Sequence, residues 1–212
     1  RVAADLEGAD LAGLNEVHWA GAFSDRSQAA ELGQMLGMAW RFAPTERRAW
    51  AASFGNAVLT RLPVEHWQRI PLAHSDGRAP RNILHLRVRG SDGPINVLVT
   101  HIDLRADHDE QLRTATALFE SLAPPVILMG DLNTTARDPQ LADLLDRPGV
   151  AFAPADARTV TDKKRVDWII VRGLDVLESS ARDTPASDHP VVRARPATKG
   201  TPGSDAGDGG SP

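Results

Sequence analysis

The segment that most constrains the fold is residues 126–129, a run of four large apolar residues that leads directly into Gly130 and Asp131. Pro124 and Pro125 precede the run and end any helix before it. A continuous apolar run of this length, bounded by breakers, is typical of a strand that is buried on both faces. We therefore expect a layered fold with a covered strand, and a carboxylate where that strand ends.

The rest of the chain alternates strands with helices, and hairpins interrupt the alternation. Residues 83–89 have the apolar and polar alternation of a half-buried strand, and a turn signal at 91–94 joins them to the apolar segment 95–100. The clearest helix is predicted over 107–122. Further strands are expected over 11–17, 57–60, 166–171, 174–177 and 191–194, and further helices over 28–38 and 139–145. The pattern favours an α/β fold with a mixed sheet, or with two packed sheets and outer helices.

The length of 212 residues suits a single domain. From residue 196 onward the sequence has no large apolar side chain and consists mainly of glycine, proline, serine, threonine and aspartate. Such a composition cannot bury enough apolar surface to fold, so it predicts a disordered tail or linker. We therefore expect one domain over residues 1–195 and a tail over 196–212.

Composition restricts the kinds of site and partner. The chain has no cysteine, which excludes disulfides and thiolate metal sites. Its formal net charge of −4 gives no basic excess of the kind that marks nucleic-acid binding, although net charge does not report how the charges are distributed. No apolar stretch is long enough to span a bilayer. We expect a monomer, and we favour a cytoplasmic location while a secreted protein or a domain of a larger protein stays open.

Side chains that can do chemistry stand at the ends of five predicted strands. A carboxylate, imidazole or amide at the end of an apolar strand is costly to bury without a partner. Because catalytic residues commonly lie at strand ends and in adjoining loops, we expect these side chains to share one pocket. They are Asn15 and Glu16, His101, Asp131 and Asn133, Asp167, and finally Asp188 and His189.

Six segments resemble, in order along the chain, the motifs of the endonuclease/exonuclease/phosphatase superfamily, which comprises DNase I-like metal-dependent phosphoesterases. Each motif alone is a common strand end or turn, but the ordered set covers residues 9–190 and is specific. The resemblance implies a four-layer sandwich of two mixed β-sheets with flanking helices. The segments are Ala9-Asp10-Leu11-Ala12-Gly13-Leu14-Asn15-Glu16-Val17, Phe54-Gly55-Asn56-Ala57-Val58-Leu59-Thr60-Arg61-Leu62-Pro63-Val64, Val99-Thr100-His101, Met129-Gly130-Asp131-Leu132-Asn133, Arg165-Val166-Asp167-Trp168-Ile169 and Ser187-Asp188-His189.

The resemblance also implies hydrolysis of a phosphoester bond by direct attack of water, with Mg²⁺ or Mn²⁺ as the cofactor. It makes Glu16 a metal ligand and Asp188 a second ligand, either direct or through water. Hard oxygen ligands of this kind suit these ions. No activated cysteine or serine stands out, so no covalent intermediate is implied.

Five further residues receive catalytic roles from the resemblance. Asp167 would pair with His189 and raise the basicity of its imidazole. Asp131 would accept a proton from the attacking water or orient that water, and Asn133 would donate to the water or to a phosphoryl oxygen. His101 would donate to the phosphate. Whether Asp131 or His189 is the proton acceptor stays open.

The chain departs from the family pattern at its start. The family begins with a strand that ends in an asparagine beside the metal, whereas here only a partial helix over residues 2–9 precedes Glu16 and no asparagine precedes Asn15. We therefore expect the fold to lack that first strand and the site to lack that ligand. The sequence has no tyrosine, so a tyrosine contact to phosphate is also missing.

The substrate class is less constrained than the chemistry. A small soluble phosphodiester or phosphomonoester is our first expectation, a lipid headgroup stays possible, and DNA or RNA is the alternative within the same family. A non-catalytic module that binds phosphate or a partner is the alternative from another class, and retention of the whole polar set argues against it. Arg81 and Arg105 are weaker candidates for a phosphate contact.

Overall fold

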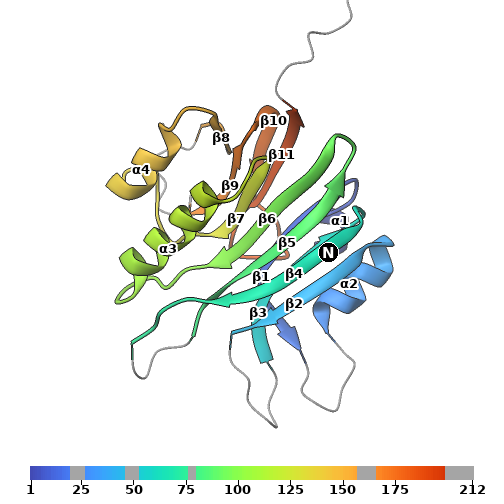
Figure 1. Cartoon of the computed structure of the whole chain (residues 1–212). Helices are drawn as coiled ribbons and strands as arrows, with labels where there is room; N and C mark the ends of the chain where they lie inside the picture. Colours follow the sequence, from blue (N-terminus) through green and yellow to red (C-terminus); the bar gives the residue numbers. More distant parts are fainter. Residues whose placement is uncertain (20–26, 46–52, 76–79, 157–165, 199–212) are drawn as a thin grey trace, which may run out of the picture.

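The computed structural model describes residues 1–19, 27–45, 53–75, 80–156 and 166–198. Its largest element is a six-stranded sheet, shown in the middle of Figure 1, in which the strands follow the order β4-β5-β6-β7-β9-β8. The sheet is mixed, because β6 and β7 are parallel and the other neighbours are antiparallel. Its strands are β4 (Val64–Pro71), β5 (Asn82–Gly90), β6 (Gly93–His101), β7 (Val126–Asp131), β8 (Val150–Ala153) and β9 (Asp167–Arg172).

Two smaller antiparallel sheets form a second β layer. One has three strands in the order β1-β3-β2, and the other is the pair β10-β11. The three-stranded sheet contacts β5, β6 and β7, whereas the pair contacts β8 and β9. The strands are β1 (Leu11–Trp19), β2 (Ala39–Pro44), β3 (Ser53–Thr60), β10 (Leu174–Arg182) and β11 (Val191–Thr198).

Helices cover the outer faces of both β layers. The helices α3 (His108–Ser121) and α4 (Pro139–Leu145) pack on one face of the six-stranded sheet, where Phe119 and Leu112 are fully buried against Leu128. The helices α1 (Val2–Asp5) and α2 (Gln28–Leu36) lie beside the three-stranded sheet (Figure 1). The α/β sandwich of packed sheets and outer helices that the sequence predicted is confirmed.

The two β layers approach closely where β1 crosses β7. A Cβ atom added to Gly13 of β1 would lie 2.6 Å from the sulfur of Met129, which is nearer than real Cβ contacts come. The contact belongs to a core that includes Val99 and Ile127 of the large sheet. Glycine at position 13 therefore lets the two layers pack without a gap at this crossing.

Three unpredicted strands and the burial of one predicted strand differ from the sequence analysis. The strands β2, β4 and β8 were not predicted, and β4 carries a mostly exposed run of side chains because it is the outermost strand of its sheet. The strand β5 is buried on both faces over residues 82–86, whereas from Arg87 onward it alternates exposed and buried side chains as predicted. His85 on β5 is accordingly buried, with its ring nitrogens 3.2 Å from Gln68 and Asn96.

At the C-terminal end, β11 continues to Thr198, three residues past the boundary expected at residue 195. Residues 199–212 lie outside the described residues, so the predicted tail stays a prediction, as does the missing first strand. Within the described part of the chain, no helix combines the length and the apolar character that a bilayer crossing requires.

Candidate active site at one end of the two sheets

The pairing of three neighbouring strands sets a row of polar side chains at one end of the large sheet. The parallel register of β6 and β7 places His101 opposite Asp131, and the antiparallel register of β7 and β9 places Asp131 opposite Asp167. Directly opposite residues point to the same face of a sheet, and neighbouring strands lie about 4.7–4.9 Å apart. The backbone pairing of β6, β7 and β9 therefore brings His101, Asp131 and Asp167 next to one another, as neighbours on one face of the sheet.

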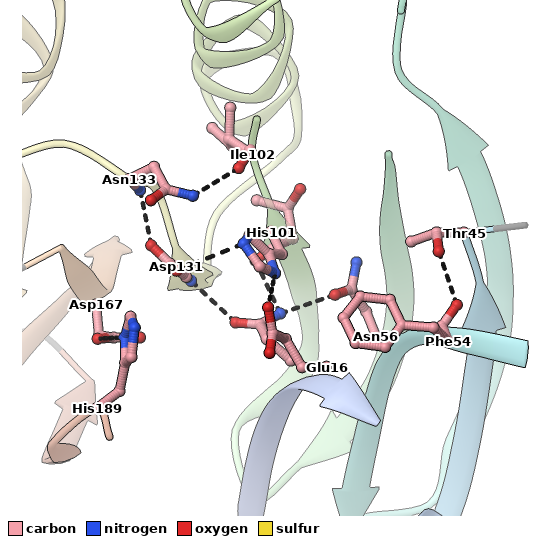
Figure 2. Close-up of polar contacts among 12 residues, drawn as sticks. Glu16, Thr45, Phe54, Asn56, His101, Ile102, Asp131, Asn133, Asp167 and His189 are labelled. Carbon is pink, nitrogen blue, oxygen red and sulfur yellow. Dashed lines mark hydrogen bonds and ion pairs between the residues drawn. The ribbon is translucent and has the colours of Figure 1, made fainter. Parts of the chain in front are cut away.

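The loop before β11 adds His189 to this row. The Nδ1 atom of His189 lies 2.8 Å from Asp167 Oδ2, and His101 Nε2 lies 3.5 Å from Asp131 Oδ2 (Figure 2). One ligand atom each from Asp131, Asp167 and His189 lie within 4.8 Å of one another, close enough to hold a metal ion. The pairing of Asp167 with His189 that the resemblance implied is therefore present in the geometry.

Burial moves the pKa values of Asp131 and His101 in opposite directions. Asp131 is only 6% exposed, and desolvation raises its pKa to about 6 although the backbone N–H of Asn133 donates to it. For His101, burial lowers the pKa to about 3, and the positive charges of Arg81 and His189 lower it further. Near neutral pH, His101 is therefore an uncharged imidazole and Asp131 is a carboxylate poised close to its pKa.

The pair of Asp167 and His189 shows competing effects on both pKa values. Partial burial disfavours the charged form of His189, but the hydrogen bond to Asp167 and the nearby carboxylates, including Asp188, outweigh it and raise the pKa. Burial raises the pKa of Asp167, and the hydrogen bond from His189 opposes that rise. The imidazole is thus held through Nδ1, which leaves Nε2 directed to other partners.

Glu16 reaches the same place from the other β layer. It lies in an irregularity of β1 between Leu14 and Val17, where its φ of 57° is in the left-handed region. Its side chain is 63% exposed, and Oε1 lies 3.8 Å from His101 Nδ1, beyond hydrogen-bond distance. Bulges of this kind re-aim a side chain, and strain in a non-glycine residue often marks a functional position.

The turn after β7 fixes the position of Asn133. Its φ is 48°, its backbone N–H donates to Asp131 Oδ1 at 2.8 Å, and its side-chain Nδ2 donates to the carbonyl of Ile102 at 2.8 Å. Before the turn, Gly130 has a φ of 136°, and a Cβ added there would lie 1.9 Å from the Thr100 carbonyl oxygen. Only glycine fits the backbone at position 130 of this motif, whereas Asp131 and Asn133 contribute side chains to the site.

A chain of amides, of which Asn56 and Asn82 are buried and Asn15 is partly buried, ties the two β layers together next to the site, and the sequence did not predict it as a unit. Asn15 Oδ1 accepts the backbone N–H of Asp131 at 2.9 Å, and Asn15 Nδ2 donates to Asn56 Oδ1 at 2.8 Å and to the Thr100 carbonyl at 3.0 Å. Asn56 Nδ2 in turn donates to the Asn82 carbonyl at 3.1 Å. The network fixes the end of β7 relative to β1 and β3, and its only signal in the sequence is an amide within each apolar strand.

Arg81, predicted as a weaker phosphate contact, lies close enough for its charge to act on both His101 and Asp131. The Nε atom of Arg81 and the Nδ1 atom of His101 are buried, and neither has a hydrogen-bond partner among the described residues. Either nitrogen of a neutral imidazole can donate or accept, so these two buried atoms leave hydrogen-bonding capacity unused in residues that act on or contact Asp131. Arg105 shows no comparable feature.

The predicted site residues therefore fall into two groups. Five of them, together with Arg81, lie at or next to the end of the large sheet, and Glu16 faces them from β1. Asp188 is exposed and acts on the pKa of both Asp167 and His189, but neither it nor Glu16 belongs to the compact group of three potential ligands. The five are His101, Asp131, Asn133, Asp167 and His189.

Comparisons with known proteins agree with this architecture. A sequence model described as the endonuclease/exonuclease/phosphatase family matches residues 1–189. No curated protein matches the chain. Among solved structures, a family protein from Leptotrichia buccalis aligns with a TM-score of 0.70 and 17% identity over 92% of this chain and 90% of its own.

Two further solved structures share the fold at similarly low identity. A mannosyl-6-phosphatase from Bacteroides thetaiotaomicron has a TM-score of 0.65 and 15% identity, over 92% of this chain and 89% of its own. D. rerio TDP2, complexed with a single-strand DNA product, has a TM-score of 0.64 and 17% identity, over 89% of this chain and 86% of its own. Identities this low show a common fold and leave the substrate undecided.

Proposed function

Because the chain belongs to the endonuclease/exonuclease/phosphatase family, we propose that it is a divalent-metal-dependent hydrolase of phosphoester bonds that works by direct attack of water on phosphorus. The observation that carries the proposal is the row of His101, Asp131 and Asp167, completed by His189 at 2.8 Å from Asp167. An anionic phosphoester needs charge neutralisation and an aligned water, and this row combines a carboxylate acceptor with imidazole donors.

Glu16 and Asp188 are the residues that we propose hold Mg²⁺ or Mn²⁺. Both are carboxylates, and the Oε1 atom of Glu16 points toward the orphaned Nδ1 of His101 without bonding to it. Within the compact group, by contrast, Asp167 and His189 are already engaged with each other. The ion, when bound, would neutralise negative charge on the phosphoryl oxygens.

Asp131 is the residue that we propose accepts the proton of the attacking water. Its Oδ1 is occupied by the Asn133 N–H, whereas Oδ2 faces His101 at 3.5 Å and has capacity to accept. A pKa of about 6 suits a base that works near neutral pH. The water oxygen forms the new bond to phosphorus, the bond to the leaving oxygen breaks, and the water proton moves to Asp131.

His189 is proposed as a cationic donor to a phosphoryl oxygen. Its raised pKa keeps it protonated over more of the neutral range, and Asp167 holds Nδ1 so that Nε2 can reach the substrate. The buried Arg81 Nε and the neutral His101 would supply two further donors to the same group. Asn133, whose backbone N–H donates to Asp131 and whose side chain donates to the Ile102 carbonyl, would hold the Asp131 carboxylate in a fixed orientation.

The substrate that we propose first is a small soluble phosphodiester or phosphomonoester. The net charge of −4 supports it, because the chain lacks the basic excess that holds a long nucleic acid. A nuclease activity is the second candidate, because a neighbour of the same fold was captured with a single-strand DNA product and Arg81 adds positive charge to the site. The catalytic domain would comprise residues 1–195.

The test is hydrolysis of a chromogenic phosphodiester by the chain with Mg²⁺, with Mn²⁺ and with EDTA. We expect turnover with either metal, loss in EDTA, and loss in H189A. Turnover that continues in EDTA would contradict the metal requirement. If neither a diester nor a monoester is hydrolysed but labelled single-strand DNA is cut, the small-molecule substrate is wrong and the nuclease is right.

A further inference from the structure

A buried histidine outside the row of site residues contacts the turn that carries two of them. The turn after β7 holds Asp131 and Asn133, and Leu132 between them has its side chain fully buried in the core against α3 and α4. The backbone carbonyl oxygen of Leu132 lies 3.2 Å from Nε2 of His108, in a buried contact. A buried backbone carbonyl without a donor is costly, so this imidazole stabilises the backbone of the turn.

The position of His108 follows from the apolar face of α3. His108 is the first residue of that helix, and Leu112, Ala115 and Phe119 follow it at intervals of four, three and four residues. Residues at this spacing lie on one face of a helix, and all four are buried against the large sheet. The face that anchors α3 therefore begins with an imidazole, directed at the turn after β7.

The partners of its two ring nitrogens settle which one carries a hydrogen. The Leu132 carbonyl can only accept, so Nε2 must donate to it. Nδ1 lies 3.0 Å from Oδ1 of Asp109, whose side chain is 85% exposed. When Nδ1 carries no hydrogen, that carboxylate can turn to water, whereas the buried carbonyl cannot. The bond from Nε2 is therefore kept whether the ring is neutral or protonated.

The same turn of α3 also holds the loop after β6. Gln111 is fully buried, and its Oε1 accepts the backbone N–H of Asp103 at 2.8 Å. In that loop, the carbonyl of Ile102 accepts Nδ2 of Asn133 at 2.8 Å (Figure 2). Through His108 and Gln111, the start of α3 thus fixes the two loops relative to each other.

We propose that His108 is a positioning residue, which holds the turn after β7 through the Leu132 carbonyl so that Asp131 faces the attacking water. His108 acts through the backbone on either side of Leu132 and does not touch the substrate. This inference rests on the proposed hydrolase for its effect on turnover. Because alignment of a base matters in the transition state and not in substrate binding, loss of the bond should lower kcat and leave KM nearly unchanged.

The test compares H108Q with H108M, two unbranched side chains of similar length, of which only glutamine has an N–H donor. We expect the kcat of H108M to fall at least about tenfold, because a displacement of about 1 Å can cost roughly 10²-fold, and H108Q to keep most of the activity. D109N, which changes only the exposed partner, should turn over like the parent. Circular dichroism checks that each variant is folded.

Two further readouts do not depend on catalysis. Hydrogen exchange of the Asn133 amide, which donates to Asp131, should be faster in H108M and unchanged in H108Q. Nitrogen NMR of the parent, which needs no variant, should find the hydrogen of the neutral His108 ring on Nε2.

The proposal is overturned by a kcat of folded H108M equal to that of the parent, by H108Q or D109N as impaired as H108M, by unchanged exchange at Asn133, or by a neutral ring with its hydrogen on Nδ1. A merely structural histidine would lower the stability of H108M and leave its kcat intact. If the parent hydrolyses no phosphoester, the proposed function fails, and exchange and NMR still decide whether His108 holds the turn.

Discussion

The two β layers place their site residues by different means. On the large sheet, His101, Asp131 and Asp167 are neighbours because three strands pair in one register, and Asp131 and His101 are almost fully buried. On the small sheets, Glu16 stands in a strained bulge and Asp188 in the loop before β11, and both are exposed.

The difference teaches which part of the site is built before any ligand arrives. The row on the large sheet is fixed by backbone hydrogen bonds, and its pKa values are set by burial. Glu16 and Asp188, by contrast, are exposed side chains that line the same cavity as the row. We expect proton transfer to depend on the first region and metal affinity on the second, and the following experiments can break that division.

The largest expected effect is on catalysis through the large sheet. D131N keeps the shape of the side chain but removes the proposed proton acceptor, so turnover should fall by about 10²–10⁴-fold, the usual contribution of a general base. Steady-state kinetics at saturating Mg²⁺ would measure it, with circular dichroism as the control for folding. Turnover of D131N within a few-fold of the parent would remove Asp131 from the mechanism.

Metal affinity should respond next, and through the small sheets. E16Q removes a charge from the proposed metal site, so Mn²⁺ affinity should fall by at least roughly tenfold, the scale that even indirect partners reach. Titration calorimetry would measure it, and excess metal should restore part of the activity. E65Q, in a surface ion pair with Arg87 and Arg89, is the matched control. If D131N weakens Mn²⁺ binding and E16Q does not, the compact group around Asp131 holds the ion instead.

The free energy of unfolding should report the hydrogen bonds through which Asn15 connects the two β layers. N15A removes the partner of the Asp131 N–H and of Asn56, so the free energy of unfolding should fall by roughly 2–3 kcal/mol, the cost of leaving buried polar groups unsatisfied. S121A, which loses one exposed hydrogen bond at the end of α3, should change it little. Urea denaturation of both variants makes the comparison, and equal stabilities would mean that the amide chain does not couple the layers.

The smallest effect concerns pH. The pKa of Asp131 is raised from 3.8 to about 6 in the folded chain, so the folded state binds this proton more tightly than the unfolded state. The stability gained from that proton is fully present below pH 3.8 and is lost as pH rises through about 6. In EDTA, the parent should therefore lose roughly 2 kcal/mol of stability relative to D131N between pH 4 and pH 8. A constant difference between the two unfolding free energies at pH 4 and pH 8 would contradict the burial effect.

Sequence reasoning anticipated the large-sheet row better than its surroundings. The apolar run that ends in Asp131 predicts a buried strand, and the family motifs supply the partner strands of His101 and Asp167. The mutual placement of Arg81 and the Asn15–Asn56–Asn82 chain was not predictable, because it depends on which strands of the two layers cross. The strand β4 escaped prediction because an edge strand with exposed side chains lacks the hydrophobic alternation that identifies strands.

The common register of His101, Asp131 and Asp167 also bears on how such a chain can change over generations. A single inserted or deleted residue within β7 would turn Asp131 to the opposite face of the sheet and scatter the row. A change of length in the turn between α4 and β8, which lies outside the row, leaves it in place. The spacing within three strands is therefore a stricter requirement of the row than the length of loops that carry none of its side chains.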